Sequence, residues 1–334
     1  MKIVVVGCGS IGTRHLKNLY SLGIKNLVAV DLDSRRLENF KKEIPNLKTY
    51  TNLVNSLKQE SPIDAGFICT PTASHIPVAT KLAKAKIHLF IEKPLSHNLK
   101  GVNNLQKIVK KNKMVAMMGM NYRFHPGLKL VKKLVDSKKI GEILSARVFG
   151  GYFLPYWHPN TDYRKEYAAR KELGGGVILT SLSHTIDYLM WIFGDINLVY
   201  AWKDNIGDLK IDVEDAAILI LKTKMNKPIL VYSDFLQKNN QHDLEIVGEK
   251  GTIKFNFLSD CVDVYFDKDK NWQKLKYKFE INDMYVEEAK HFLYCVRKRL
   301  ETMIDINNGL KTLKLAILIK KSSIQNKSIT KNAT

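Results

Sequence analysis

Residues 1–31 read MKIVVVGCGSIGTRHLKNLYSLGIKNLVAVD, and this stretch decides the fold of the first part of the chain. The short apolar run 2–6 is rich in β-branched residues, which predicts a buried parallel strand. It leads into a complete G-x-G-x-x-G at residues 7–12, a helical pattern, and a second strand over 27–30 that ends at Asp31. Strand, glycine turn, helix, strand and acid in this order predict a dinucleotide-binding unit.

Each glycine of the turn has a separate physical task. Gly7 permits the tight turn, Gly9 lets a pyrophosphate approach the backbone, and Gly12 lets helix and strand pack closely. The helix that starts at Ser10 and Ile11 presents free N–H groups to the phosphates. A glycine triplet alone also occurs in ordinary turns, so the prediction depends on the whole ordered stretch.

Asp31 indicates which dinucleotide is bound. Its carboxylate would accept hydrogen bonds from the adenosine ribose hydroxyls and would repel a 2′-phosphate, which favours NAD over NADP. The alternative is that Arg35 or Arg36, further into the next helix, covers such a phosphate.

Length and composition describe an ordinary globular protein. The 334 residues, 45% hydrophobic and 26% charged, suffice for two domains with a large core. No apolar run reaches the roughly 18 residues of a membrane span, and the N-terminus enters a strand directly instead of a signal peptide. We therefore expect a cytoplasmic protein. The four cysteines are scattered, without metal-ligand spacing, so we expect reduced thiols and no metal.

The formal charge is +20, from 53 basic and 33 acidic residues. Such a charge can indicate nucleic acid, an acidic membrane surface or an anionic substrate as partner. The lysines are spread along the whole chain and no nucleic-acid module is visible, so we expect no nucleic-acid partner. A general lysine bias would give the same number.

Strands and helices alternate over the first 120 residues, which predicts a doubly wound parallel sheet. Ligands of such sheets bind beyond the carboxyl ends of the strands. This rule gathers residues 7–12, Asp31, 70–75 and 92–94 at one edge. The later elements that we expect here are helices at 34–43, 51–59, 74–84 and up to 111, and strands at 65–69, 87–91 and 114–118.

The rhythm changes after residue 121. A helix at 127–137 and a strand at 143–149 are followed by residues 150–176, which have no clear period. Their aromatic and arginine content argues against disorder and predicts a substrate-covering loop. We place Trp157, Arg164 and Arg170 of this loop in the substrate site.

The remainder of the chain is predicted as one helix, an antiparallel sheet and two more helices. Turn residues in the short gaps between the β segments favour antiparallel pairing. The expected domains are 1–121 and 122–322, followed by a frayed tail over 323–334. The expected elements are a helix at 177–193, strands at 197–203, 214–221, 228–236, 242–248, 251–257, 261–266 and 273–279, and helices at 283–299 and 308–321.

The helix at 177–193 carries two stripes, one apolar and one polar. The polar stripe contains Thr180, His184, Asp187 and Trp191 at helical spacing. A histidine three residues before an aspartate can share a proton network, which indicates a site. The alternative is a solvated face with a locally paired His184 and Asp187.

These separate signals occur together in one family that we know. Over nearly its full length the chain resembles the glucose–fructose oxidoreductase, inositol dehydrogenase and rhizopine catabolism (Gfo/Idh/MocA) family. The resemblance implies an α/β fold with an N-terminal Rossmann domain and a C-terminal α/β domain whose large, mostly antiparallel open sheet often forms a dimer or tetramer interface. It also implies a nicotinamide cofactor and oxidation or reduction of a sugar-like carbon. The matching features are Gly7-x-Gly9-x-x-Gly12 with Asp31, Cys69-Thr70-Pro71 with His75, Glu92-Lys93-Pro94, Asn121-Tyr122-Arg123-Phe124-His125-Pro126, and Gly174-Gly175-Gly176 before His184-Thr185-Ile186-Asp187.

The resemblance also assigns roles to residues. Lys93 would hydrogen-bond the reacting hydroxyl, His184 would move its proton, and Asp187 would hold the substrate or orient the site. The Lys93–Pro94 bond is often cis in the family. In addition to the glycine turn, Asp31 and Lys93, we assign to the cofactor site Thr70, Pro71, His75, Glu92 and Arg123. In addition to the loop residues, we assign to the substrate site Tyr122 and Thr180.

One departure from the family pattern concerns position 180. Many members carry an acid four residues before the histidine, where this chain has Thr180. A hydroxyl does not stabilise an imidazolium as a carboxylate does, which puts the inositol-type triad in doubt. Residues 162–171 look like a subgroup often encoded with surface-polysaccharide genes, which favours an anionic or nucleotide sugar.

Two further interpretations remain beside that of a dehydrogenase. The fold could serve as a non-catalytic dinucleotide sensor or scaffold, or transient oxidation could drive elimination or glycoside cleavage. The β segments 218–221 and 229–231 are apolar on both faces, which predicts a homodimer or homotetramer.

Overall fold

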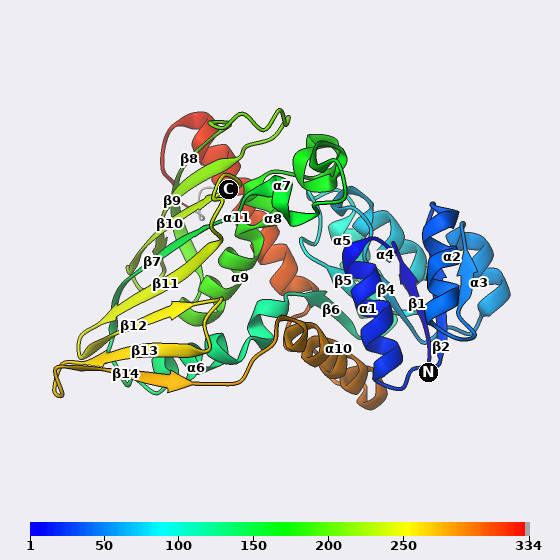
Figure 1. Ribbon diagram of the computed structural model, residues 1–334, viewed down its shortest axis with the longest axis horizontal. Helices are drawn as coiled ribbons and strands as arrows, with labels where there is room; N and C mark the ends of the chain where they lie inside the picture. Colours follow the sequence, from blue (N-terminus) through cyan, green and yellow to red (C-terminus); the bar gives the residue numbers. More distant parts are fainter. Residues whose placement is uncertain (331–334) are drawn as a thin grey trace. The chain divides into compact units, whose positions relative to one another are not determined.

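The computed structural model describes residues 1–330, which form two compact units (Figure 1). The first unit comprises residues 1–121 together with 281–313, and the second comprises 122–280 together with the chain from Lys314 onward. The expected domain of residues 122–322 is therefore interrupted, because residues 281–313 pack with the first unit.

The first unit contains a six-stranded parallel sheet of strand order β3-β2-β1-β4-β5-β6, which confirms the predicted doubly wound sheet. The central strands β4 and β5 are buried on both faces, as a sheet with helices on either side requires. The strands are β1 Lys2–Val6, β2 Asn26–Val30, β3 Lys48–Tyr50, β4 Ala65–Ile68, β5 His88–Glu92 and β6 Ala116–Gly119. The helices between them are α1 Ser10–Ser21, α2 Ser34–Glu43, α3 Leu53–Glu60, η1 Thr72–Ser74, α4 His75–Lys84 and α5 Val102–Lys111.

Two late helices contribute to this unit: α10, Ile281–Lys298, and the first part of α11, Ile306–Gln325. The amide groups of Asn282 and Asn18 exchange two hydrogen bonds of 3.2 and 2.9 Å, which fix α10 on α1. Phe292 packs edge-on against the stacked rings of Phe67 and Phe90. An amphipathic pattern predicts that a helix is buried but not which core buries it. The expected second domain therefore included residues 281–313, which belong to the first unit.

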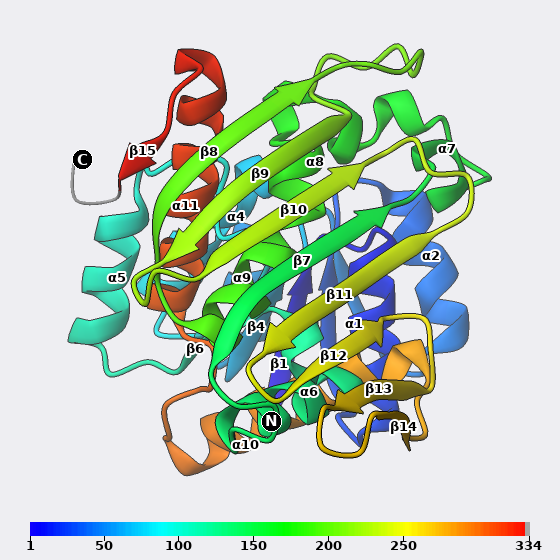
Figure 2. The same ribbon diagram turned by 90° about the vertical axis from the view of Figure 1, so that its left-hand side faces the viewer.

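The second unit is built on a nine-stranded sheet of order β14-β13-β12-β11-β7-β10-β9-β8-β15 (Figure 2). Strands β7 and β10 are parallel and every other pair is antiparallel, so the predicted mostly antiparallel sheet is confirmed. The strands are β7 Ile143–Gly151, β8 Ile196–Asp204, β9 Ala216–Thr223, β10 Pro228–Asp234, β11 Gln241–Gly248, β12 Gly251–Asn256, β13 Cys261–Phe266, β14 Asn271–Lys276 and β15 Ile329–Thr330.

Helices of the second unit cover one face of this sheet, behind the strands in Figure 2. The segment 150–176 has little regular structure, as predicted, and consists of short helical turns joined by bends. The helices after residue 120 are η2 Asn121–Phe124, α6 Pro126–Asp136, α7 Leu154–Trp157, η3 Tyr163–Lys165, η4 Tyr167–Ala169, η5 Lys171–Leu173, α8 Val177–Thr180 and α9 Leu182–Phe193.

The predicted helix 177–193 is interrupted at Ser181, so it forms α8 and α9. The hydroxyl of Ser183 donates to the carbonyl of Thr180 at 3.0 Å, and the His184 N–H bonds the Ser181 carbonyl three residues back. These contacts compete with the regular i to i−4 hydrogen bonds and explain the interruption.

The predicted frayed tail is wrong for the part of it that the structure describes. Helix α11 continues to Gln325, and the hydroxyl of Ser323 accepts the Lys203 N–H at 3.1 Å. Strand β15 then pairs with β8, where Ile329 lies opposite Val199 and is 7% exposed. Residues 331–334 lie outside the described residues. No helix in residues 1–330 is long and apolar enough to cross a membrane.

Candidate functional site

The glycine turn between β1 and α1 has the shape that a dinucleotide pyrophosphate requires. Gly7 has φ +89°, and a Cβ there would lie 2.7 Å from the backbone of Cys69 and Thr70. A Cβ on Gly12 would lie 1.9 Å from the Gly7 carbonyl oxygen. Above Gly9 the space is open, since the nearest atom to an added Cβ is an Arg36 nitrogen at 3.9 Å. The turn therefore leaves room only where the phosphates would approach.

Two further observations agree with a bound dinucleotide. Gly9 caps α1 without a side-chain hydrogen bond, so the first N–H groups of α1, among them those of Ser10 and Ile11, face outward from the turn. The buried hydroxyl of Thr70, two residues after β4, has no hydrogen-bond partner among the described residues. Both groups suit a ligand with acceptor oxygens. Pro71 follows on the surface and begins the turn into η1.

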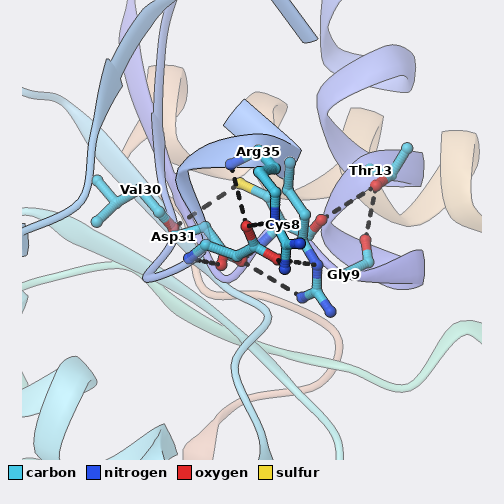
Figure 3. Close-up of polar contacts among 8 residues, drawn as sticks. Cys8, Gly9, Thr13, Val30, Asp31 and Arg35 are labelled. Atoms are coloured by element: carbon cyan, nitrogen blue, oxygen red, sulfur yellow. Dashed lines mark hydrogen bonds and ion pairs between the residues drawn. The ribbon is translucent and has the colours of Figure 1, made fainter. Parts of the chain in front are cut away.

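Asp31, directly after β2, is held by the backbone of both neighbouring loops (Figure 3). Its carboxylate accepts the Cys8 N–H at 2.6 Å and the Asp33 N–H at 2.8 Å. A guanidinium nitrogen of Arg36 lies 3.9 Å from the Asp31 carboxylate, closer than its sequence position suggests. Arg35 pairs instead with Asp33 at 3.3 Å. The carboxylate that would meet the ribose is thus fixed, with one arginine beside it.

His75 links the loops that follow β4 and β5. Its Nδ1 lies 2.7 Å from the Pro94 carbonyl oxygen and its Nε2 lies 2.8 Å from the Thr70 carbonyl oxygen. Burial lowers the pKa of His75, and a neutral ring has one N–H to donate, to one carbonyl at a time. The side chain is 1% exposed, so the geometry favours a role in positioning the two loops over direct contact with the cofactor.

Glu92 and Lys93 lie where β5 ends at the same sheet edge. One Glu92 oxygen is 2.7 Å from Nε2 of His15, and the other accepts the Lys93 backbone N–H at 3.2 Å. The Lys93–Pro94 peptide bond is cis, as the resemblance implies. Burial lowers the pKa of Lys93 to about 8, although the negative charge of Glu92 opposes this. Glu92 thus holds the lysine backbone.

In the second unit, Asp187 of α9 and Arg123 of η2 form a buried, two-pronged ion pair. Arg123 Nε donates to one Asp187 oxygen at 2.8 Å and Nη2 donates to the other at 2.7 Å. Burial raises the pKa of Asp187, while the bonds from Arg123 oppose the shift. Asp187 and Thr180 are 1% and 0% exposed, so the alternative of a solvated face is wrong.

His184 is half-buried and lies flat against an aromatic ring. Tyr122 stacks on it with ring centroids 4.3 Å apart and an angle of 16° between the planes. Phe257 supports Tyr122 from 4.8 Å. Burial raises the pKa of Tyr122 to about 12, so its hydroxyl keeps its proton. The stack fixes the plane of the imidazole.

The loop residues assigned to the substrate already have local partners. Trp157 is 39% exposed and stacks on His158, with ring centroids 5.1 Å apart. Arg164 pairs with Asp162 at 2.8 Å, and Arg170 pairs with Glu172. The Thr180 hydroxyl donates to the carbonyl of Gly176, the residue before α8, at 2.8 Å, and it also interacts with the Tyr152 side chain.

Sequence reasoning missed two things in this region. It treated His15 only as part of a helical pattern, although the structure brings it to Glu92. It also paired Asp187 with the neighbouring His184, whereas both Asp187 oxygens are bonded by Arg123, 64 residues away. The position of His15 among apolar residues of a helix could have indicated a buried polar contact. No sequence spacing indicates that Arg123 pairs with Asp187.

The fold and the glycine turn agree with comparisons to known families. Residues 1–120 match the model of an oxidoreductase family with an NAD-binding Rossmann fold, and residues 128–254 match the GFO/IDH/MocA C-terminal domain. The chain therefore belongs to the Gfo/Idh/MocA family of oxidoreductases, and its first unit contains an NAD-binding Rossmann domain.

Individual relatives extend over the whole chain. The myo-inositol 2-dehydrogenase of Thermotoga maritima is 29% identical and covers 98% of each chain. Two solved structures share the fold: levoglucosan dehydrogenase in complex with NADH (TM-score 0.89, 19% identity, 99% of this chain and 98% of that one) and myo-inositol 2-dehydrogenase from Lactobacillus plantarum (TM-score 0.84, 24% identity, 99% of each). These relatives are named as dehydrogenases of inositol and levoglucosan, the latter solved with NADH, and this chain is an enzyme of the same family.

Proposed function

We propose that this enzyme transfers hydride between NAD and a secondary alcohol or ketone carbon of a sugar, sugar acid or nucleotide sugar. The observation that carries the proposal is Lys93, a lysine at the end of β5 whose pKa is lowered to about 8 at the sheet edge that holds the glycine turn. A lysine with a pKa near 8 can gain or lose its proton close to neutral pH. Its ammonium form can stabilise an oxygen that becomes negative.

The residues of the chain then divide the work of oxidation. NAD, held by the turn at residues 7–12 and by Asp31, supplies the hydride acceptor when bound. Lys93 hydrogen-bonds the reacting hydroxyl and stabilises the developing alkoxide. His184 takes the hydroxyl proton, with its ring plane fixed by the stack on Tyr122. Lys93 belongs to the first unit and His184 to the second, so their action at one carbon is part of the proposal.

Asp187 supports this arrangement by holding Arg123 inside the second unit. Asp187 lies one turn after His184 on α9. We assign it as a positioning residue, because both of its carboxylate oxygens are already bonded by Arg123. We propose a carbohydrate or polyol substrate, the class on which the named relatives act. An anionic group on it would have to displace Asp162 from Arg164 or Glu172 from Arg170.

Matched substitutions test the roles of the two catalytic residues. Lys93→Met and His184→Ala should each lower kcat about a hundredfold or more, the scale of a positioned acid or base. The Kd for NAD should change little. Thr180→Ala is the control and should retain most of the activity, because a neutral hydroxyl has little charge to contribute to the reaction. Turnover of His184→Ala at the wild-type rate would contradict the assignment.

The pH dependence separates two roles for Lys93. If the ammonium form is needed, oxidation should slow as pH rises through about 8, because the lysine then loses its proton. If the neutral amine were the base, the rate would rise through the same range. The residual activity of Lys93→Met should lack this dependence. A wild-type rate that rises through this range would reject the alkoxide-stabilising role.

The alternatives predict different products. A sensor or scaffold would bind NAD but give no turnover with any sugar, and transient oxidation would release product without net NADH. Mass spectrometry of small molecules released from the denatured protein would identify the bound nicotinamide and any retained sugar. A cytoplasmic location and a link to surface-polysaccharide synthesis belong to this proposal and not to the observed structure.

A further inference from the structure

A buried group of three ionisable side chains lies in the first unit, and the proposed reaction assigns no proton or hydride transfer to any of them. It consists of His15 on α1, Glu92 at the end of β5 and Glu288 on α10. One ligand atom from each lies within 4.8 Å of the others. Their exposed fractions are 0%, 7% and 0%. Elements from three distant parts of the chain therefore bring these groups together inside the core.

Glu288 is the member that ordinary packing does not explain. Neither of its carboxylate oxygens has a hydrogen-bond partner among the described residues, and both are fully buried. An unpaired buried polar group destabilises the folded state, and a charged one destabilises it more. Burial and the negative charge of Glu92 raise the pKa of Glu288 well above its usual range. Two neighbouring carboxylates in such a place need a positive charge or a proton between them.

Lys93 is within electrostatic reach of Glu92, whereas the aromatic rings around His15 carry no charge. The rings of Phe67 and Phe90 lie 5.2 and 5.0 Å from the His15 ring, and the Tyr285 ring lies 6.2 Å from it. Cys69 is buried nearby, and burial with the charges of Glu92 and Glu288 raises the pKa of its thiol well above the usual range. The Cys69 thiol is therefore neutral in the metal-free cluster.

We propose that His15, Glu92 and Glu288 bind one divalent transition-metal ion of the Zn²⁺ class. One imidazole and two carboxylates are ligands that Zn²⁺ takes at about 2.0–2.2 Å, and water can complete four-coordination. Ligands of one tetrahedral ion lie about 3.4 Å apart, so side-chain shifts of under about 1 Å would suffice from the present spacing. The dication cancels the two carboxylate charges and gives Glu288 a partner.

The site would serve the fold of the first unit and not the reaction itself. It joins α1, β5 and α10, and Glu92 also accepts the Lys93 backbone N–H at 3.2 Å. A bound ion would thus fix the end of the strand that carries Lys93. The alternative occupant of the cluster is a single proton on Glu288. A protonated carboxyl would still need an acceptor, which the described residues do not supply in this arrangement.

Metal binding by the full-length chain tests the proposal without any assay of turnover. Protein stripped with a chelator is titrated with Zn²⁺ at neutral pH, with heat release and Tm as readouts. Wild type should bind one ion per chain and gain Tm. Glu288→Gln keeps the shape but removes the charge, and should weaken binding about tenfold or more. Glu287→Gln is the control, since Glu287 lies next in the same helix and pairs with Lys290 on the surface.

Co²⁺ in place of Zn²⁺ identifies the ligands. Nitrogen and oxygen ligands should give only weak d–d absorption, whereas a thiolate adds a strong charge-transfer band. Such a band would assign the ion to a cysteine, either Cys69 beside the cluster or Cys295, whose sulfur lies 3.6 Å from a His291 nitrogen, and would overturn the proposal. If Glu288→Gln fails to fold, His15→Gln takes its place in the titration.

Two other results would also reject the metal site. The first is wild-type protein that takes up no ion, or takes it up as tightly as Glu288→Gln does. The second is wild-type protein whose Tm does not change with Zn²⁺ while Glu288→Gln has the higher Tm, which would show that the cluster shares a proton instead.

Discussion

Asp31 and Arg36 make opposite demands on the cofactor, and their geometry decides between NAD and NADP. The Asp31 carboxylate is held by two backbone N–H groups and stays where the ribose would lie. Arg36 lies 3.9 Å away with a half-exposed side chain. The 2′-phosphate of NADP would lie next to the fixed negative charge of Asp31, and the half-exposed Arg36 would offset only part of the repulsion.

We therefore expect wild type to bind NAD at least about tenfold more tightly than NADP, about 1.4 kcal/mol. Asp31→Ser should narrow or reverse this preference, because it removes the repulsion and leaves Arg36 in place. Arg36→Ala should weaken NADP more than NAD. Titration of both cofactors against the three proteins measures this. Tighter binding of NADP by wild type would show that Arg36 outweighs Asp31.

At the same scale, the sequence could predict residues whose role follows from local spacing. The glycines, Asp31 and Lys93 belong to ordered motifs, and each lies at or directly after the end of a predicted strand. The partner of Asp187 could not be found in this way, because Arg123 is 64 residues away and the pairing arises from packing. His75 was assigned to the cofactor by motif, while the structure gives both ring nitrogens backbone partners.

At the scale of elements, patterns of hydrophobicity located nearly every strand and helix, and the departures have local causes. The helix after the three glycines divides because Ser183 bonds the Thr180 carbonyl. The polar end of the chain was expected to fray, yet Ile329 supplies one buried contact and β15 joins β8. Composition alone does not show that a two-residue strand will find an open sheet edge.

The turn between β1 and α1 allows a prediction at this scale, because two of its glycines differ in what surrounds them. Gly12→Ala would place a methyl 1.9 Å from a carbonyl oxygen, so we expect about 2–3 kcal/mol of lost stability and loss of NAD binding. Gly9→Ala meets nothing within 3.8 Å and its φ of −69° suits alanine. Its stability should change by under about 0.5 kcal/mol.

NAD binding by Gly9→Ala should nevertheless weaken about tenfold or more, since the methyl would enter the space of the pyrophosphate. Denaturant unfolding and NAD titration of both variants provide the comparison. Unchanged NAD affinity in a folded Gly9→Ala protein would mean that the phosphates do not pass over Gly9.

At the scale of the whole molecule, the second unit has one covered and one uncovered sheet face (Figure 2). Inward side chains such as Leu219, Leu221 and Val231 are fully buried. Between them, on the other face, Ile218, Ile220 and Leu230 are 39%, 48% and 50% exposed. Leu230 lies opposite Ile220 across β9 and β10, so the exposed apolar residues form a continuous surface.

This surface extends across further strands. Tyr232 stacks on Phe149 of β7 at 4.9 Å, and Trp202 of β8 lies opposite Ile218. An exposed ion pair between Arg147 and Glu245 at 2.9 Å borders it on the β11 side. A flat apolar centre with a charged border is typical of an interface, and a two-fold axis lets the same face bind its own copy.

We therefore expect the chain to form a homodimer or homotetramer through this face. Ile220→Glu with Leu230→Glu would place two carboxylates in a desolvated contact and should yield monomers, while each unit stays folded because both side chains already face outward. Tyr294→Glu, an equally exposed aromatic position on α10, is the control and should leave the assembly unchanged. Light scattering at micromolar concentration measures the mass. A wild-type monomer at that concentration would contradict the expectation. So would a paired variant that keeps the wild-type mass, because the assembly would then use another surface.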